Sequence, residues 1–337
     1  MSMNKLELFE HPLAPTPIVK LSGRYDGELG NEIYVKREDL IPFSFGGNKA
    51  RKAAYFYREM QDEQPDIIMT YGSNSSNHCR IIANLAAALG LPCHIISAGE
   101  EERGRDGRQL FNRVLVQQFG ATVETVPVEE VHDTIENRLQ ACRDAGKKPY
   151  FIQGGGHGNA GTQSYVDAFR EIRQQEQEMG TTFPYIFHAS GTGSTQAGLV
   201  CGKELTGAEN TIVGISIART GPRGRDVVKE SILDYYRDVR QQSEGQPVVG
   251  GADLTSLFRE EDLIFTDAYR QGGYGKFTPE EEECLEKVML QDGIPMDTTY
   301  VGKAFCGMLQ YLRDNNIRGE KVLFLHTGGA PLFFDRL

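Results

Sequence analysis

A chain of 337 residues with 39% hydrophobic and 25% charged residues has the composition of a globular protein, and its length favours about two domains. The net charge of −11 argues against nucleic acid as a partner, because such binding depends on Lys and Arg that neutralise phosphates. The first residues do not resemble a secretory signal and no apolar run is long enough to span a bilayer, so we expect a cytoplasmic protein that does not enter membranes.

The first half of the chain alternates short apolar runs with longer helical segments. TPIVKL at residues 16–21 and EIYVKRED at residues 32–39 predict two short strands, and a helix follows from Lys49. From Pro65 to residue 155, four β-branched runs are separated by helical patterns. Strands that are buried on both faces read as near-continuous apolar runs, so this block predicts a parallel sheet with crossover helices.

A second block of the same kind follows a Glu- and Gln-rich stretch at residues 171–184. Its predicted strands lie at residues 184–190, 211–217 and 321–329, and its predicted helices at residues 193–205, 226–242, 279–293 and 301–316. The polar residues 241–254 predict a surface loop. The six cysteines include no CxxC pair and no histidine at zinc-ligand spacing, so we expect reduced thiols and no metal site.

Four glycine-rich turns follow predicted strands, which is where ligands bind in open α/β sheets. They lie at residues 71–78, 153–159, 189–198 and 326–331. In the third, SGTGST, glycines, Ser194 and Thr195 can direct amides and hydroxyls toward one anion at a helix N-terminus, which suits a phosphate. The P-loop and GxGxxG patterns are absent, so nucleotides are disfavoured, and a turn needed only for packing is the alternative.

Lys49 stands in the first turn of its helix, directly after Gly46, Gly47 and Asn48. A cation is mildly unfavourable there, because a helix N-terminus carries partial positive charge. A desolvated lysine near positive potential has a lowered pKa, and its neutral amine can form an imine with a phosphorylated aldehyde. Lys49 is therefore a candidate covalent anchor, whereas Lys52 is a weaker candidate that we expect on a solvated helix face.

Seven segments in chain order together resemble a known family: TPIVKL, VKREDLIPFSFGGNKARK, SSNHCR, HASGTGSTQAGL, GGYGKFTPEE, YVGKAFCGML and HTGGAP. They are similar to the pyridoxal-phosphate enzymes of tryptophan-synthase β fold (fold type II), in the branch of 1-aminocyclopropane-1-carboxylate (ACC) deaminase and D-cysteine desulfhydrase. The resemblance implies two open, twisted parallel-sheet α/β domains with the cofactor in the cleft between them. It implies a large cofactor-binding domain of residues 1–48 and 164–337, a smaller domain of residues 49–163, and a homodimer.

The resemblance also implies how pyridoxal 5′-phosphate is held. Lys49 would bind it covalently, Asn77 would contact its 3-hydroxyl group, and Thr327 would partner its pyridine nitrogen. The residues around its phosphate would be those of the SGTGST turn: Ser190, Gly191, Thr192, Gly193, Ser194 and Thr195.

Four residues are candidates for proton transfer. Once the substrate amine displaces it, Lys49 can act as base or acid at the α-carbon. By the resemblance, Ser76 would shuttle a proton or hold the substrate carboxylate, and Tyr274 and Tyr300 would line the substrate pocket as acids or bases. Each has a simpler alternative, since Ser76 can cap the helix that follows it and the tyrosines can be ordinary half-buried aromatics. We expect His78 to be a packing residue or to support the site indirectly.

The choice of reaction depends on two positions. The ring-opening branch has a glutamate directly after its second active-site tyrosine, where this chain has Val301, and the neutral Thr327 would leave the pyridine nitrogen a weaker electron sink. We therefore expect a lyase that performs α,β-elimination on a small β-substituted amino acid such as D-cysteine, giving pyruvate and ammonia. The alternatives are ACC ring opening to 2-oxobutyrate, a biosynthetic β-replacement, and a metabolite-binding module without turnover. A serine hydrolase is disfavoured because no GxSxG elbow occurs.

Overall fold

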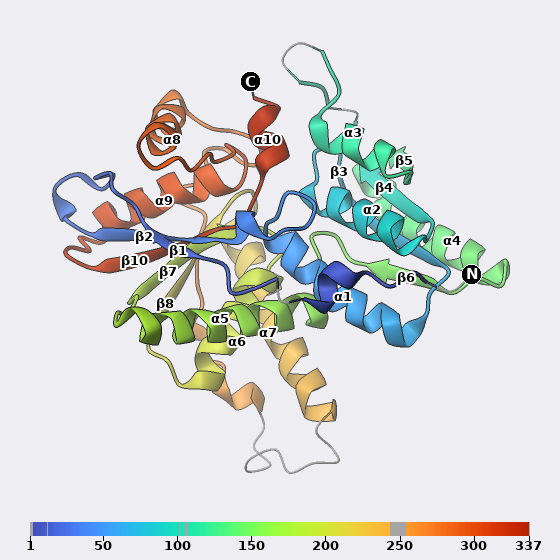
Figure 1. Cartoon of the computed structure of the whole chain (residues 1–337), viewed down its shortest axis with the longest axis horizontal. Helices are drawn as coiled ribbons and strands as arrows, with labels where there is room; N and C mark the ends of the chain where they lie inside the picture. Colours follow the sequence, from blue (N-terminus) through green and yellow to red (C-terminus); the bar gives the residue numbers. More distant parts are fainter. Residues whose placement is uncertain (1–2, 12, 101, 105–106, 243–253, 337) are drawn as a thin grey trace. The chain divides into compact units, whose positions relative to one another are not determined.

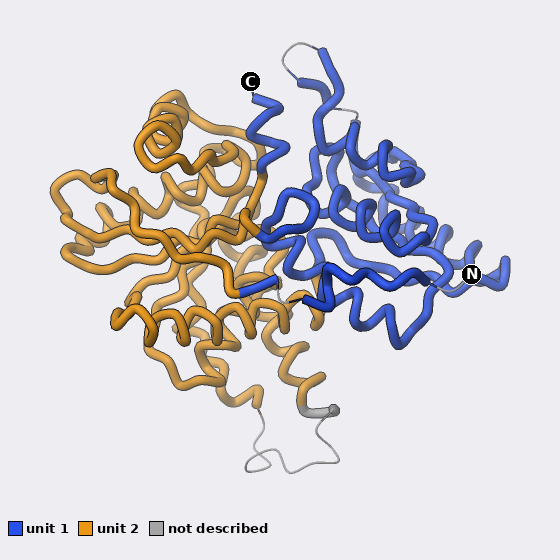
Figure 2. The backbone as a smooth tube through the Cα atoms, viewed as in Figure 1, with its two compact units in different colours: residues 1–14, 41–156, 330–337 blue, residues 15–40, 157–329 orange. Residues whose placement is uncertain are grey.

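The computed structural model of the chain describes residues 3–11, 13–100, 102–104, 107–242 and 254–336. Its contacts divide the chain into two compact units (Figure 2). Unit 1 is formed by residues 1–14, 41–156 and 330–337, and unit 2 by residues 15–40 and 157–329. Each unit contains a sheet that is wholly or mainly parallel, which confirms the predicted fold class. The bounds of the units differ from those of the predicted domains, which divide the chain after residues 48 and 163.

Unit 1 is built on a four-stranded parallel sheet in the order β5-β4-β3-β6. Its elements are α1 (Asn48–Glu63), β3 (Ile67–Ser73), α2 (Asn77–Leu89), β4 (Cys93–Ala98), α3 (Phe111–Gln118), β5 (Thr122–Val126), α4 (Val131–Asp144), β6 (Pro149–Ile152) and α10 (Ala330–Phe334). Met69 of β3 and Ile96 of β4 pack against Ile135 and Leu139 of α4. The apolar strand residues that predict this sheet therefore form its core.

Unit 2 is built on a six-stranded sheet in the order β1-β2-β10-β7-β8-β9, in which only β1 runs antiparallel to its neighbour. Its elements are β1 (Ile18–Lys20), β2 (Glu32–Arg37), α5 (Asn159–Met179), β7 (Tyr185–Ser190), α6 (Ser194–Thr206), β8 (Thr211–Ser216), α7 (Gly221–Gln242), β9 (Ile264–Thr266), α8 (Pro279–Asp292), α9 (Val301–Asp314) and β10 (Lys321–His326). Short 3₁₀ turns in the two units cover Glu7–Glu10, Gly27–Leu29, Glu38–Leu40, Val128–Glu130, Leu254–Leu257 and Glu260–Asp262.

Both faces of the six-stranded sheet are covered by helices. Figure 1 shows α8 and α9 on one face and α5 and α6 on the other. Successive side chains of a strand point to opposite faces, so Val322 and Phe324 of β10 join the core under α8 and α9, whereas Leu323 and Leu325 join the core under α5, α6 and α7. Each of these side chains contributes roughly 1.5–3 kcal/mol by its burial. The two-sided core explains why the strands read as continuous apolar runs.

Helix α5 is an element that the sequence analysis missed, because its Glu- and Gln-rich half was interpreted as the boundary between blocks. Glu, Gln and Arg are good helix formers, and the helix packs closely on α6. At their closest approach Gly198 has no side chain, and a Cβ added there would lie 2.3 Å from the Thr162 carbonyl oxygen. The strand β9 and the helix α10 are also additions, whereas most of the predicted loop at residues 241–254 lies outside the described residues. No helix in the described part of the chain is long and apolar enough to cross a membrane.

Candidate active site

The turn that leads into α1 has an unusual backbone. Four consecutive residues lie in the left-handed region, with φ of 47° at Ser44, 62° at Phe45, 65° at Gly46 and 96° at Gly47. Glycine adopts this region freely, but a side-chain-bearing residue does so at a cost of about 1–2 kcal/mol. Ser44 and Phe45 therefore adopt an unfavourable backbone conformation in this tight turn, whereas Gly46 and Gly47 complete it without that cost. Lys49 follows in the first turn of the helix.

The amine of Lys49 lies among protein groups of unit 1. Its Nζ donates a hydrogen bond to the carbonyl oxygen of Gly155 at 2.7 Å. Burial lowers the pKa of Lys49 from 10.5 to about 8, and the positive end of the α1 dipole acts in the same direction. A substantial fraction of the amine is therefore neutral near physiological pH, as a nucleophilic lysine requires.

Lys52 does not lie on a solvated helix face, as the sequence analysis expected. Its side chain is only 1% exposed, and its Nζ is 3.5 Å from the same Gly155 carbonyl oxygen. Burial and the neighbouring charge of Lys49 lower the pKa of Lys52 well below its usual value. The expectation was wrong because Lys52 shares the buried face of α1 with Phe56.

His78 is buried and supports the same region, in agreement with the prediction. Thr70 Oγ1 donates to the carbonyl oxygen of Ile152 at 2.7 Å, so it must accept its other hydrogen bond from His78 Nε2 at 2.8 Å. Burial and the charges of Lys49 and Lys52 lower the pKa of His78 well below 6.5. The ring is therefore neutral, with its proton on Nε2 and a lone pair on Nδ1.

Two predicted site residues begin helix α2. Ser76 is its N-cap, and its Oγ accepts a hydrogen bond from the backbone N–H of Cys79 at 3.2 Å, as the simpler alternative predicted. The serine hydroxyl hydrogen is not used by that contact. Asn77 is the first residue of the helix, and its Oδ1 accepts from Asn112 Nδ2 at 2.9 Å.

In unit 2 the SGTGST turn connects β7 to α6. Gly193 is the N-cap of α6 with φ of 104°, and the first intrahelical bond runs from Ala197 N to Gly193 O at 2.9 Å. The N-terminus of a helix of this kind suits an anion. Ser194 and Thr195 are buried in this first turn. The hydroxyl of Ser190, by contrast, donates a hydrogen bond within the protein, to Gln196 Oε1 at 2.9 Å.

His157, to which the sequence analysis assigned no role, contacts this turn. Its Nδ1 lies 3.0 Å from the carbonyl oxygen of Thr192, and a carbonyl can only accept, so Nδ1 carries a proton. The contact fixes the carbonyl group of Thr192 within the turn. A histidine among glycines after a strand was the available signal, but its partner lies 35 residues away.

The two predicted tyrosines lie together. The hydroxyls of Tyr274 and Tyr300 are 2.6 Å apart, and their rings meet edge to face with centroids 5.6 Å apart. One hydroxyl must donate to the other, so the pair can pass a proton between its two oxygens. Unit 2 thus brings together two hydroxyl groups from residues that are 26 positions apart in sequence.

A buried lysine supports the loop of Tyr274. Lys303 on α9 is 1% exposed, and its Nζ donates to the carbonyl oxygens of Arg270, at 2.9 Å, and Gly273. Burial lowers the pKa of Lys303 to about 8. The sequence analysis missed this residue, although a lysine in the otherwise apolar pattern of α9 is a recognisable signal.

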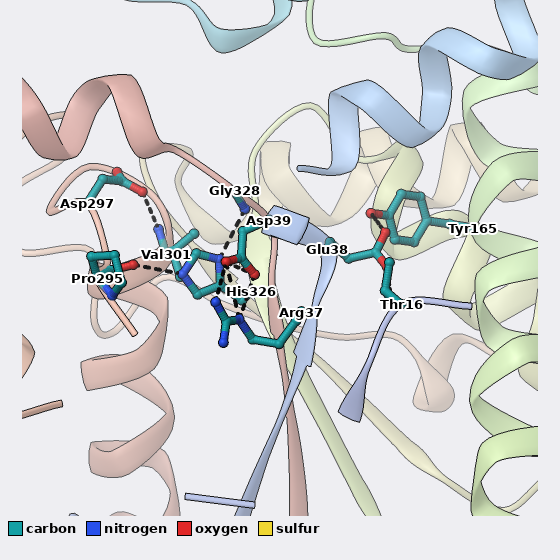
Figure 3. A network of polar contacts seen from close by, with 10 residues as sticks. All are labelled: Thr16, Arg37, Glu38, Asp39, Tyr165, Pro295, Asp297, Val301, His326 and Gly328. Atoms are coloured by element: carbon teal, nitrogen blue, oxygen red, sulfur yellow. Dashed lines mark hydrogen bonds and ion pairs between the residues drawn. The ribbon is translucent and has the colours of Figure 1, made fainter. Parts of the chain in front are cut away.

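A buried aspartate supports Tyr300. The carboxylate of Asp297 accepts hydrogen bonds from the backbone N–H groups of Thr299 at 2.9 Å, Tyr300 at 2.7 Å and Val301 at 3.2 Å. Figure 3 shows it directed at the start of α9. Burial raises the pKa of Asp297 from 3.8 to about 6, although the three amides act in the opposite direction. The carboxylate therefore fixes the turn from which the Tyr300 side chain projects.

Thr327 follows the last residue of β10, His326, whose ring is held from several directions (Figure 3). His326 Nε2 lies 3.0 Å from the carbonyl oxygen of Pro295 and donates to it, and Nδ1 accepts from Gly328 N at 3.3 Å. Nδ1 is also 3.4 Å from a carboxylate oxygen of Asp39. The chain before and after Thr327 is thereby anchored, and Thr327 itself is largely buried.

The predicted residues divide between the two units. Lys49, Ser76 and Asn77 belong to unit 1, and the SGTGST turn, the tyrosine pair and Thr327 belong to unit 2. Within each unit the supporting residues are buried side chains, and apart from His78 the sequence analysis either did not name them or placed them on the surface.

Known proteins resemble the chain over nearly its whole length. A family model described as "pyridoxal-phosphate dependent enzyme" matches residues 10–328. A D-cysteine desulfhydrase of Klebsiella pneumoniae is 34% identical, with 95% of this chain and 93% of that protein covered. A putative ACC deaminase of Pyrococcus abyssi is 31% identical, with 95% of this chain and 90% of that protein covered. The crystal structure of an ACC deaminase homologue superposes with a TM-score of 0.79 and 30% identity, covering 97% of this chain and 95% of that one.

Proposed function

The chain belongs to the family of pyridoxal-phosphate-dependent enzymes, in the branch of D-cysteine desulfhydrase and ACC deaminase, and we propose that it is a lyase. The proposed reaction is α,β-elimination of a small β-substituted amino acid. With D-cysteine and water as reactants, the products are pyruvate, ammonia and hydrogen sulfide, which balances the atoms.

The donor groups of both units are of the kind that pyridoxal phosphate requires. Lys49 has an amine that burial keeps partly neutral, which suits covalent attachment to an aldehyde. The first turn of α6, behind Gly193, has the amide arrangement that suits a phosphate. When bound, the cofactor draws electrons from the substrate α-carbon and so makes its proton acidic. We propose Lys49 as the attachment residue and residues 190–195 as the phosphate site.

We further propose roles for the residues that complete the cofactor site. Asn77 would donate a hydrogen bond to the 3-oxygen of the ring, and Thr327 would partner the pyridine nitrogen. A hydroxyl, unlike a carboxylate, does not stabilise a proton on that nitrogen by charge. Weaker electron withdrawal is sufficient where the leaving group is good, as a thiolate is.

The chain's own residues then account for the proton transfers. Lys49 Nζ, once released by the substrate amine, would remove the α-proton. The hydroxyl pair of Tyr274 and Tyr300 would protonate the departing sulfur, since either oxygen can pass its proton to the other. Ser76 would hold the substrate carboxylate or carry a proton with the hydroxyl hydrogen that its capping contact leaves over.

The observation that carries the choice of reaction is Val301. Its side chain is fully buried in the apolar core beneath α9, directly after Tyr300, and it offers no acid where the resemblance expects the glutamate of a ring-opening enzyme. ACC ring opening is kept as the second candidate because a putative ACC deaminase is 31% identical to this chain. If elimination is not observed, the chain is better explained as a β-replacement enzyme or a metabolite-binding module.

A substrate screen tests the proposal. The purified holoenzyme is offered D- and L-cysteine, D-serine, β-chloro-D-alanine and ACC, and α-keto acid and sulfide release are measured. We expect pyruvate from the β-substituted substrates, with D-cysteine among the best. Efficient formation of 2-oxobutyrate from ACC together with inactivity toward the other compounds would identify ring opening instead. Release of no keto acid from any compound would favour replacement chemistry or a binding protein.

A further inference from the structure

Arg80 on α2 is a fully buried cation with an unusual set of partners. Its Nε donates to Asn112 Oδ1 at 2.8 Å, one terminal nitrogen lies 3.4 Å from Asn77 Oδ1, and the other donates to the carbonyl oxygen and, at 2.9 Å, to Oγ of Ser44. No carboxylate in the described part of the chain contacts it. Burial lowers its pKa to about 9, so the guanidinium remains charged at neutral pH. A buried charge without a countercharge destabilises the folded protein, so we expect Arg80 to have a functional role.

The partners of Arg80 determine the orientation of two side-chain amides, first that of Asn112 and through it that of Asn77. Asn112 is fully buried, and because its Oδ1 faces the Arg80 donor, its Nδ2 must be the atom that donates to Ser75 O at 2.7 Å and to Asn77 Oδ1 at 2.9 Å. Asn77 thus faces two donors and must present its oxygen to them. Its own Nδ2 points away from both and donates to none of the residues that the structure describes.

The same guanidinium holds the left-handed turn before Lys49. It binds both acceptors of Ser44, and its central carbon lies 5.6 Å from the ring centroid of Phe45. These are the two residues of the turn that are not glycine. Arg80 therefore contacts the strained backbone that leads to Lys49 as well as the amide of Asn77.

We propose that Arg80, acting through Asn112, is a positioning residue that fixes the Asn77 amide with its NH₂ group as the part offered to the cofactor. The inference rests on the role proposed above for Asn77. A correctly oriented NH₂ stabilises the negative charge on the ring 3-oxygen, whereas an amide turned by 180° would present its own oxygen there. No step of the reaction passes through Arg80.

Asn112→Asp tests the proposal with almost no change in volume. The carboxylate still binds Arg80, as an ion pair, but it now places an acceptor opposite Asn77 Oδ1. Two facing acceptors repel, so we expect the Asn77 amide to turn over. The dissociation constant of pyridoxal phosphate from the apo-protein should rise about tenfold or more, the loss of one hydrogen bond to a charged group.

A thermodynamic cycle distinguishes positioning from general disruption. In an Asn77→Ala background there is no amide to turn, so Asn112→Asp should change the dissociation constant by less than about twofold. Asn112→Ala, which places no new charge in the interior, is a second variant and should show the same pattern with a smaller effect of about threefold. Asn137→Asp, on the exposed side of α4, is the matched control and should leave the constant unchanged.

Arg80→Lys completes the set, because a single ammonium cannot reach Asn112, Asn77 and Ser44 together. Its effect should be clearly smaller in the Asn77→Ala background, where the contacts with Asn112 and Ser44 can still be lost but no amide at position 77 remains to be oriented. Equal factors in both backgrounds for these variants, or unchanged affinity in Asn112→Asp, would overturn the proposal. If mass spectrometry of the borohydride-reduced wild type finds the cofactor on a residue other than Lys49, the proposed function fails, yet the cycle still decides whether Asn112 and Arg80 act through Asn77.

Discussion

Replacing Asp297 by Asn should remove a specific pH dependence from the stability of the protein. Asp297 is 1% exposed and has a pKa of about 6 in the folded protein, against 3.8 for an exposed aspartate. Because the folded state holds the proton more tightly, it binds more protons than the unfolded state between these values. Stability from this group is therefore fully present below pH 3.8 and is lost as the pH rises through 6.

The size of this effect follows from the two pKa values. Each pKa unit corresponds to about 1.4 kcal/mol, so the difference between 3.8 and about 6 corresponds to about 3 kcal/mol. Asp297→Asn cannot ionise and lacks this term. It also loses part of the hydrogen bonding to the amides of Thr299, Tyr300 and Val301, a penalty that does not itself titrate. Relative to the wild type, the variant should gain about 2.4 kcal/mol as the pH rises from 4 to 7, because part of the full difference already lies below pH 4.

The measurement is urea unfolding of both proteins at a series of pH values from 4 to 7.5. The chain contains no tryptophan, so far-UV circular dichroism and tyrosine fluorescence report the transitions. Asp234→Asn, on the exposed face of α7, is the matched control for the loss of one carboxylate. A difference between Asp297→Asn and wild type that stays constant within about 0.5 kcal/mol over this range would refute the reasoning.

Three further predictions concern other parts of the molecule. Lys49→Ala should abolish the visible absorption band of the holoenzyme and lower turnover at least about 1,000-fold, and a spectrum that is unchanged would contradict the proposed attachment. Lys303→Met should leave the free energy of unfolding at pH 7 within about 1 kcal/mol of the wild-type value, because an apolar side chain replaces a buried cation. The same variant should lower kcat about tenfold, because the loop that carries Tyr274 loses its hydrogen bonds to Lys303. A normal kcat would show that the loop needs no such support. Gly198→Ala should destabilise the protein by about 2–4 kcal/mol, because its Cβ would meet the backbone of α5, whereas Gly207→Ala at the end of the same helix meets no neighbour and should cost about 1 kcal/mol for its left-handed backbone. If urea unfolding shows that the two glycine variants lose equal free energy of unfolding, then α5 and α6 can move apart at little cost to accommodate the added methyl group.

Much of the fold could be predicted because the strands are buried on both faces. Runs such as residues 66–72 and 321–329 have no polar alternation, and each of these two runs ends at a glycine. The errors fall where that signal is weak. Helix α5 is polar along its exposed side, and β9 has only three residues, too few for any periodicity. The antiparallel direction of β1 depends on its pairing with β2, which a sequence pattern does not encode.

The candidate site could be predicted only in part, because motifs name residues but not their supports. Lys49 is indicated by its glycine turn, yet the burial of Lys52 depends on which face of α1 packs inward. A helical projection was an available signal, since Lys52 precedes Phe56 by one turn. Asp297 was also detectable as an acid just before a helix. By contrast, the contact of Arg80 with Asn112 joins two helices 32 residues apart and follows from tertiary structure alone.

The order of the strands has a consequence for biosynthesis. Strand β10, residues 321–326, leaves the ribosome after β2 and β7, but it lies between them in the sheet. Until it emerges, the nascent chain has two separate strand groups with unpaired edges, which are prone to aggregate. Residues 330–337 then return to the other unit. Deletions that remove β10 should therefore cause insoluble expression, out of proportion to the few residues removed.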